Sequence, residues 1–530
     1  MSAASLTLHG VPESRPAINP WIIALAVTLA TFMEVLDTSI ANVSLPHIAG
    51  GLSAGVDEST WVLTSYLVSN AIVLPLSGWM STILGRKRFY MGCVALFTLS
   101  SFLCGLAPNL ATLIFFRVLQ GAGGGGLQPS EQAILADTFP PAKRGMAFAV
   151  YGVAVVTAPA LGPTLGGYIT DNYTWRWIFF INIPVGILSL LLTSRLISDP
   201  PFLKRRKISE TRIDYIGLGM IALGLGTLQV VLDKGQRDDW FESHFILALS
   251  VISAISLLFV IWWEWRNKEP IIELHLFKDR TFASAYMLMF VLGFVLLGST
   301  LLLPLFMQTL LGYTAERAGM GLTPGGLLIM AVLPLVGFLL SKYDARRLIT
   351  IGLVALSLSL FYMRSTFNLQ MSFEMVVRAR MYQAAGLAFL FVPINTVAYA
   401  FLPREKNNAA SGLMNLARNI GGSFGISFVT TMLDRRAQYH QARMTEHLAA
   451  ANPVFQQMLQ GTTATLHAHG FSVTDASHRA YALVQGTLFR QANLLAYIDI
   501  FWLLGVIALV MVPLVFLIKR PPIGRAMAAH

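Results

Sequence analysis

The sequence has 530 residues, of which 55% are hydrophobic and 12% charged, and its net charge is +11. Soluble domains carry about 25% charged residues, so this composition excludes an ordinary soluble protein and indicates a chain that contacts the lipid bilayer along much of its length. The basic residues lie in short segments between apolar runs, so nucleic acid is not the partner that their charge predicts.

Fourteen apolar segments have about the 20 residues that a membrane-spanning helix requires. Lys and Arg are concentrated in alternate loops along the whole chain, and placing these loops in the cytoplasm also places both termini there. The sequence therefore predicts an all-α polytopic membrane protein. The predicted spans are 21–45, 61–82, 89–107, 110–135, 145–167, 177–197, 213–232, 245–265, 282–307, 318–340, 347–366, 374–402, 410–433 and 494–518.

Two stretches of the first part recur in the second part. The motif RVLQGAG at Arg117 recurs as RMYQAAG at Arg380, and Gly78 with its downstream basic cluster recurs at Gly337. Such a repeat of hydrophobic segments is typical of a transporter with two halves. The predicted parts are a cytoplasmic tail (1–20), an N-terminal six-helix half (21–197), an inserted pair of helices (198–281), a C-terminal six-helix half (282–518) with an outer loop (434–493), and a second cytoplasmic tail (519–530).

Charged residues inside the first and fourth spans are the strongest candidates for chemistry, because a charge within the membrane is costly and usually functional. Glu34 and Asp37 are three residues apart and share a helix face. Counted from the outer ends of their spans, Asp37 and Arg117 lie at a similar depth. We interpret Asp37, Glu34 and Arg117 as a proton-coupling site. The alternatives are a fixed structural ion pair, or an Asp37 that caps a helix break near Asn42.

Further polar residues in the spans are candidates for the lining of a central cavity. Glu131 follows a glycine cluster and is either a second proton-coupling or substrate-binding carboxylate, or a residue paired with Lys143 or Arg144 at the membrane surface. The remaining residues predicted to line the substrate cavity are Gln120, Gln128, Asn395, Asn415 and Arg418.

Glycines and prolines predict close helix contacts. The cluster from Gly121 to Gly126 fits the pattern GxGxxG, but no strand precedes it, so helix packing explains it better than nucleotide binding. In the fifth span we expect the glycines to press on a helix of the other half and to gate the outer cavity. The residues assigned to gating and packing are Gly78, Arg86, Gly162, Pro163, Gly166 and Gly167.

Five motifs in chain order resemble those of the fourteen-span drug:proton antiporters of the EmrB type, in the major facilitator superfamily. In one departure, Thr82 occupies the position where that family often has an aspartate. The motifs are LDTSIANVSLP (36–46), GWMSTILGRKR (78–88), RVLQGAG (117–123), APALGPTLGG (158–167) and WRWIFFINIPVG (175–186).

The resemblance implies the major facilitator fold with 14 transmembrane helices. It further implies a proton-coupled multidrug exporter of the inner membrane that takes amphipathic drugs, exchanges them for protons and needs no cofactor beyond the proton gradient. Its implied partners are a periplasmic EmrA-like adaptor and a TolC-like outer-membrane channel, and the outer loop is our candidate for binding the adaptor. The alternative for that loop is an insertion without function.

Two other functions remain to be compared with drug export. One is export of a single endogenous metabolite, such as a siderophore or a lipid-like compound. The other is a membrane enzyme or sensor, but the sequence has no catalytic constellation, so we expect no enzyme activity. His467 and His469 lack further ligands at fixed spacing, so we expect no metal site.

Overall fold

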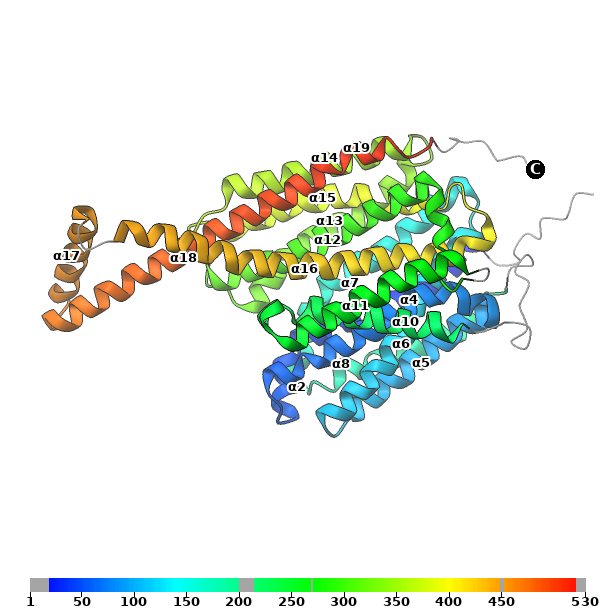
Figure 1. Cartoon of the computed structure of the whole chain (residues 1–530), viewed down its shortest axis with the longest axis horizontal. Coiled ribbons are helices and arrows are strands. Elements are labelled where there is room, and N and C mark those ends of the chain that lie inside the picture. Colours follow the sequence, from blue (N-terminus) through cyan, green and yellow to red (C-terminus); the bar gives the residue numbers. More distant parts are fainter. Residues whose placement is uncertain (1–18, 200–213, 268–269, 449–451, 521–530) are drawn as a thin grey trace, which may run out of the picture.

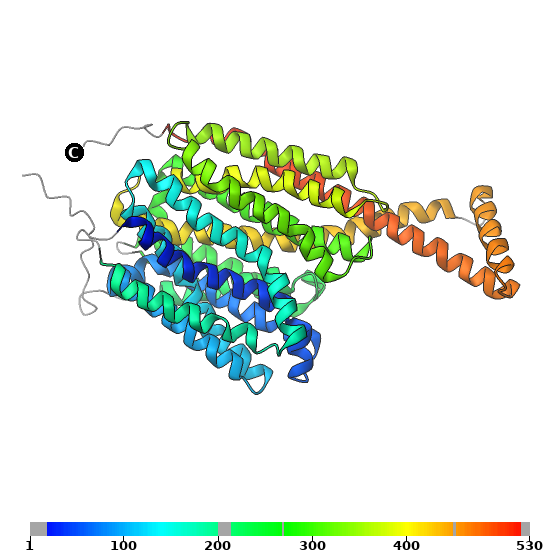
Figure 2. The same ribbon diagram turned by 180° about the vertical axis from the view of Figure 1, so that it is seen from behind.

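The computed structural model describes residues 19–199, 214–267, 270–448 and 452–520, and all the helices below belong to these residues. Most of the two predicted cytoplasmic tails, and the loop at 200–213, lie outside the described residues. In Figure 2 the start of α1, in dark blue, and the end of the chain's last helices, in dark red, lie on the same face of the bundle. We call this face the terminal side and the opposite face the stalk side.

Six spans form the N-terminal half, with short helices between the first two on the stalk side. Asn19 caps the first helix by accepting a hydrogen bond from the Trp21 amide at 3.0 Å. The elements are α1 (Pro20–Val43), α2 (Leu45–Gly51), α3 (Val56–Ser59), α4 (Trp61–Leu84), α5 (Arg86–Leu106), α6 (Leu110–Thr138), α7 (Pro141–Asn172), α8 (Trp177–Phe180) and α9 (Asn182–Leu196).

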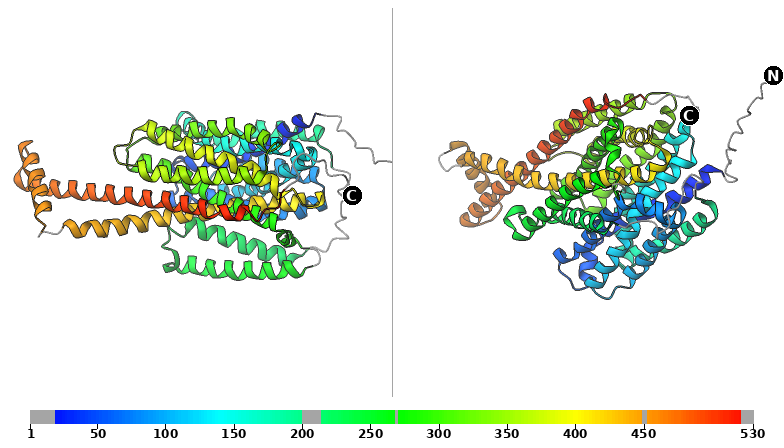
Figure 3. Two further views of the ribbon diagram at one scale, coloured as in Figure 1. Left: turned by 90° about the horizontal axis from the view of Figure 1, so that it is seen from above. Right: turned by 45° about the vertical axis from the view of Figure 1, so that its right-hand side comes forward.

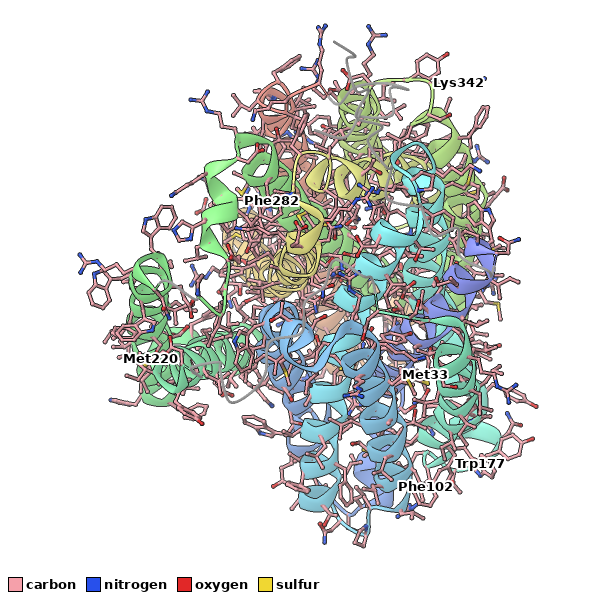
Figure 4. The ribbon with its side chains drawn as sticks, turned by 90° about the vertical axis from the view of Figure 1, so that its right-hand side faces the viewer. Met33, Phe102, Trp177, Met220, Phe282 and Lys342 are labelled. Carbon is pink, nitrogen blue, oxygen red and sulfur yellow. The ribbon has the colours of Figure 1, made fainter. Side chains whose placement is uncertain are left out.

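The inserted pair, α10 (Tyr215–Lys234) and α11 (His244–Arg266), stands at the side of the bundle. Figure 4 views the terminal side, with Met220 marking the pair, and Figure 3 shows it running beside the other helices. Of the two, α10 packs on α4 and α16, whereas α11 packs mainly on α10 and presents an apolar face outward. This apolar face is what contact with lipid requires.

The C-terminal half repeats the six spans and adds a projection. A 3₁₀ turn, η3 (Leu274–Lys278), leads into it from the inserted pair. Ser372 caps α15 by accepting from the Met375 amide. The elements are α12 (Arg280–Thr309), α13 (Ala315–Leu339), α14 (Ala345–Thr366), α15 (Phe373–Ala398), α16 (Asn407–Thr445), α17 (Pro453–Ala468), α18 (Val473–Val510) and α19 (Val512–Val515).

Each predicted span coincides with described helical structure. Twelve helices are long and apolar enough to cross a membrane, or thirteen if the bent α7 is one span. The remaining long helix, α16, packs between α12, α4 and α18 but is too polar to pass this test. Its polar face is buried, because Asn407, Asn408, Asn415 and Arg418 all face other helices. The structure therefore agrees with fourteen spans, while length and composition alone support twelve or thirteen.

The segment predicted as a partly helical outer loop at 434–493 is helical over most of its length. Helices α16 and α18 continue beyond the bundle, and α17 lies across their far ends, as Figure 1 shows. A small apolar cluster of Phe455, Leu459 and Ala480 joins α17 to α18. At the base of this projection, Asp499 accepts hydrogen bonds from Arg436 Nε at 2.8 Å and from His440 Nε2 at 2.7 Å. We call residues 434–493 the stalk.

The two halves are in close contact on the terminal side. A Cβ atom placed on Gly78 of α4 would lie 2.8 Å from Ala409 Cα of α16, and one placed on Gly337 of α13 would lie 3.0 Å from Gly145 O of α7. Toward the stalk side, α7 and α13 line a cavity of about 480 Å³ beside the contact of Pro163 with Gly319. The structure is therefore closed on the terminal side and hollowed toward the stalk side.

Because the α4–α16 contact leaves no room for a side chain, we expect Gly78→Leu to open the terminal side. Spin labels at Leu84 and Arg404, which are exposed on this side, would show longer distances in Gly78→Leu than in the parent. Gly92→Leu is the control, since a Cβ atom on Gly92 meets nothing within 4 Å. Identical distance distributions in Gly78→Leu and in the parent would contradict this assignment of the contact.

Candidate functional site

Buried polar side chains form a network through the middle of the bundle. They come from both halves and lie between helices that are otherwise apolar, where a polar group without a partner is costly. The network comprises Glu34 and Asp37 of α1, Tyr66 and Asn70 of α4, Arg117, Gln120, Gln128, Glu131 and Gln132 of α6, Tyr151 of α7, Asn182 of α9, Tyr399, and Asn415 and Arg418 of α16.

Asp37 and Arg117 form a buried ion pair. Arg117 Nη1 lies 2.6 Å from Asp37 Oδ2, and Arg117 Nε donates to the carbonyl of Val62 at 3.0 Å. Asp37 Oδ1 accepts from Gln120 Nε2 at 3.0 Å and from Asn182 Nδ2 at 2.7 Å. The sequence predicted a common depth for Asp37 and Arg117, and the structure joins them. It did not predict Asn182, a single amide in an apolar run.

The glycine cluster of α6 faces α4 and α5. A Cβ atom on Gly125 would lie 2.7 Å from Asn70 O, and one on Gly123 would lie 2.7 Å from Phe97 N. The absence of side chains therefore lets α6 approach α4 and α5 backbone to backbone. The cluster acts in helix packing, as the sequence indicated.

Glu34 lies one turn deeper and has no cationic partner in direct contact. Its Oε2 accepts from Gln128 Nε2 at 2.5 Å, and its Oε1 accepts from Tyr66 OH at 3.0 Å and from Asn70 Nδ2 at 3.4 Å. Only 4% of the residue is exposed. Three neutral donors thus hold this carboxylate, whereas Asp37 is held by a charge.

Gln128 joins Glu34 to the other half. Its Oε1 accepts from Tyr151 OH at 2.9 Å and from the guanidinium of Arg418, whose Nη1 also donates to Tyr151 OH at 3.3 Å. Arg418 belongs to α16, so the amide of Gln128 touches a carboxylate of one half and a cation of the other. A change of charge at Glu34 can therefore reach the interface through one side chain.

A second set of bonds crosses the interface nearer the terminal side. Gln132 Oε1 accepts from Asn415 Nδ2 and from Tyr399 OH, each at 3.0 Å. Of the other predicted cavity residues, Gln120 binds the Asp37 pair, and Asn395 donates to Phe391 O of its own helix at 2.9 Å. Asn415 and Arg418 thus contact the N-terminal half directly, whereas Asn395 stays within its own helix.

Glu131 is fully buried between α6 and α1. Its Oε1 accepts from Thr28 Oγ1 at 2.6 Å, and its Oε2 has no partner within the described part of the chain. Pairing with Lys143 or Arg144 was one alternative, and it is wrong, because Lys143 is exposed and Arg144 donates to Phe139 O. Glu131 lies too deep in the bundle for an ion pair at the membrane surface. The prediction that remains is a proton-coupling or substrate-binding carboxylate.

Gly78 and Arg86 both lie at the terminal contact between the halves. Arg86 pairs with Asp137 of α6, and the same carboxylate accepts from Asn407 Nδ2 of α16 at 2.8 Å. Thr82 donates only to Trp79 O of its own helix. Asp137 thus connects the basic cluster of one half to the other half, without an acid at position 82.

The expectation for the glycines of α7 is partly wrong. Cβ atoms on Gly162 and Gly166 would meet Ser39 and Ile40 of α1, which belongs to the same half, and one on Gly167 would meet nothing within 4 Å. Contact with the other half at this level is made by Pro163, whose Cβ lies 3.6 Å from the Cβ position of Gly319. Gly162 and Gly166 therefore face α1 of the same half and not the interface.

No group of three or more His, Cys, Asp or Glu side chains within the described ranges could hold a metal ion. His467 Nδ1 and His469 Nδ1 lie 2.9 Å and 2.7 Å from the carbonyl oxygens of Phe471 and Thr465. These two side chains therefore contact backbone groups within α17 and the turn that follows it.

Two repeated helical halves around a buried polar network define a multi-pass membrane transporter. The fold resembles that of the proton:xylose symporter XylE, with a TM-score of 0.62, 16% identity, and coverage of 94% of this chain and 96% of that one. The family model of the Major Facilitator Superfamily matches residues 27–426.

Full-length relatives narrow the class further. The multidrug export protein EmrB of Escherichia coli K12 is 37% identical over 95% of this chain and 96% of its own. The fatty acid resistance protein FarB of Neisseria gonorrhoeae is 38% identical over 96% of this chain and 98% of its own. The chain belongs to the major facilitator superfamily, as an EmrB-type member.

Because Arg117 neutralises a fully buried carboxylate, removing it alone should be more harmful than removing both charges. We expect Arg117→Gln to destabilise the protein by about 3–5 kcal/mol, and the double variant Asp37→Asn, Arg117→Gln by less. Thermal unfolding of the purified protein would show this order in the melting temperatures. Arg378→Gln serves as the control, because Arg378 is exposed. If the loss of stability in the double variant equals the sum of the losses in the two single variants, Asp37 and Arg117 do not stabilise one another.

Proposed function

We propose that this chain is a proton-coupled multidrug exporter, a drug:H⁺ antiporter of the inner membrane with both termini in the cytoplasm. The observation that carries the proposal is the chain of hydrogen bonds from Glu34, one of the two buried acids of α1, through Gln128 to Arg418 in the other half. The family and the names of the EmrB relatives support export of drugs rather than an enzymatic reaction.

The coupling follows from the charges in this network. The structure is closed on the terminal side and hollowed on the stalk side, which corresponds to a state that faces outward. A proton that arrives from outside neutralises either Asp37 or Glu34. Protonation of Asp37 weakens its electrostatic attraction to Arg117. Protonation of Glu34 weakens the hydrogen bonds that run through Gln128 to Arg418. The halves then rock, and a drug that enters from the cytoplasm drives release of the proton on that side.

Glu34 and Asp37 divide this work according to their partners. Asp37 is held by Arg117, so its protonation breaks an ion pair within the N-terminal half. Glu34 is connected through one amide to Arg418, so its protonation acts on the contact between halves. Glu131 is a further buried acid beside α1. We propose it as a second proton carrier.

The alternative is export of one endogenous lipid-like compound. The name of FarB, a fatty acid resistance protein, is compatible with this class of substrate, whereas the EmrB names favour drugs. A panel of chemically unrelated compounds in proteoliposomes separates the two: proton flux with several of them supports multidrug export, and flux with a single class supports the alternative.

Asp37→Asn keeps an acceptor oxygen for Gln120 and Asn182 but leaves Arg117 buried without its carboxylate, so thermal unfolding first establishes that the purified variant is folded at the assay temperature. We expect it to lose proton-coupled export, because the residue no longer binds and releases a proton. The measurement is substrate-driven proton movement in proteoliposomes under a pH gradient, with Glu374→Gln, an exposed carboxylate at the end of α15, as the control. Full coupled export by Asp37→Asn would exclude Asp37 as the coupling group.

We propose that the stalk binds a periplasmic EmrA-like adaptor, which connects the exporter to a TolC-like channel. Apolar side chains are exposed along it, including Val454, Leu483 and Phe489, and exposed apolar surface outside the bilayer is typical of a protein contact. The stalk is also much longer than a connection between two neighbouring antiparallel helices needs to be.

The exposed apolar residues of the stalk give a direct test of adaptor binding. We expect Val454→Glu with Leu483→Glu to reduce capture of the adaptor and resistance in cells, while transport in proteoliposomes continues. Gln485→Glu is the matched control, because Gln485 is exposed on the same helix as Leu483. Undiminished adaptor capture by the double variant would move the docking site elsewhere.

A further inference from the structure

Arg380 of α15 is a buried cation without an acidic partner. Only 5% of the residue is exposed, and within the described residues no Asp or Glu oxygen lies within 4.0 Å of its guanidinium. Its Nη1 donates to Gln383 Oε1 at 2.6 Å and its Nη2 to Thr300 Oγ1 at 3.4 Å, while its Nε has no partner. Such a charge in a membrane protein is costly unless a counter-ion neutralises it.

The internal repeat shows which group is missing. Arg117 and Arg380 are 263 positions apart, and the same offset relates Gln120 to Gln383 and Asp37 to Thr300. Each half thus has the same arginine and glutamine on equivalent helices. In the C-terminal half a threonine stands where the N-terminal half has the acid.

The donors that bind Asp37 in the first half are left open in the second. Gln120 Nε2 donates to Asp37 Oδ1, whereas the corresponding Gln383 Nε2 is buried and has no partner among the described residues. Together with Arg380 Nε, this makes two unsatisfied donors beside one uncompensated positive charge. An arginine fork with a neighbouring amide is a geometry that suits a carboxylate.

The cavity on the stalk side lies against the neighbouring stretch of α13, and Arg380, Gln383 and Thr300 are not among its lining residues. It has a volume of about 480 Å³, within the range of small-molecule sites, and is lined by Leu161, Thr164, Leu165, Met320, Thr323 and Pro324. Pro324 is followed by Gly325, against which the Arg380 side chain lies, since a Cβ atom there would be 2.8 Å from Arg380 Cγ. Pro324 interrupts the backbone hydrogen bonding of α13, so α13 bends readily where it lines the cavity.

On the other side of Arg380 the bundle offers only apolar contacts. One turn toward the terminal side of Thr300 and Gly325, the facing residues are Leu296, Ile329 and Leu387, which line a void of about 10 Å³. That space holds no more than one water molecule, so an organic ligand has room only toward the stalk-side cavity.

We propose that Arg380, Gln383 and Thr300 bind the carboxylate of an amphipathic organic anion, with its apolar part in the cavity between α7 and α13. The ligand's carboxylate takes the place that Asp37 holds in the other half. This inference deepens the proposed export function, because it assigns a substrate class to the C-terminal half. The site would discriminate organic anions from neutral and cationic compounds of the same length.

The test measures binding to the full-length protein in nanodiscs of phosphatidylcholine, with no transport step. The probes are dodecanoate, dodecan-1-ol and dodecyltrimethylammonium, and empty discs give the background. We expect Arg380→Gln to weaken binding of dodecanoate by about 10-fold or more, which is the loss of one charged bidentate contact, and to leave the other two probes unchanged. Arg378→Gln, two residues away on the same helix, should bind all three probes like the parent.

Thr300→Asp is the second variant, and it keeps Arg380 in place. Its carboxylate restores the arrangement of the first half and should exclude dodecanoate to a similar extent, even if Arg380→Gln fails to fold. Dodecanoate affinity equal to the parent in either folded variant overturns the proposal. If adding phosphatidylglycerol to the discs abolishes the Arg380-dependent binding, the site belongs to an anionic lipid head group, and the proposal is also overturned.

These outcomes are independent of the export mechanism. If the wild-type protein shows no proton-coupled flux with any compound, the proposed function is refuted, and the dodecanoate binding measurement is still valid. Conversely, unaltered dodecanoate binding in Arg380→Gln refutes the anion site and leaves coupled export of other substrates intact.

Discussion

The cost of a buried charge in a membrane governs the arrangement of this bundle. Arg117 and Asp37 lie at full burial and satisfy one another, with Gln120 and Asn182 completing the shell of the carboxylate. Three helices, α1, α6 and α9, must be in register for these side chains to meet. The pair therefore fixes the packing of the N-terminal half, whatever further role its protons have.

The sequence revealed the parts of this site that are chemically unusual for their position. A carboxylate or guanidinium inside an apolar span is rare, so Glu34, Asp37, Arg117 and Arg418 could be singled out from composition alone. Neutral polar residues gave a weaker signal, because Asn, Gln and Tyr occur on many span surfaces, and only some of those in the site were predicted. Asn182 and Tyr151 were missed for this reason, although Asn182 donates to Asp37 and Tyr151 bonds to both Gln128 and Arg418.

Helix rotation was the second quantity that the sequence did not contain. A glycine-rich face predicts a close contact but does not identify the partner, and Gly162 and Gly166 face α1 where the other half was expected. The length of α16 and α18 beyond the bundle was hidden for a related reason. Hydropathy marks where a helix leaves the lipid, not where it ends, so a polar helical extension reads as a loop. The fold class and the spans, by contrast, depend on apolar length and repeat, which the sequence carries directly.

The two halves share a scaffold but differ in how their charges are compensated. In the N-terminal half the acid is part of the chain, so the arginine has a permanent partner whose charge only a proton can change. In the C-terminal half the equivalent arginine faces a threonine, and compensation must come from elsewhere. On the proposed function, this difference separates the tasks: one half responds to protons and the other to the substrate. Gln128 and Arg418 then connect the two, because each lies in one half and bonds to the other. An antiporter needs this connection, since a proton and a substrate that acted on unlinked halves would not exchange.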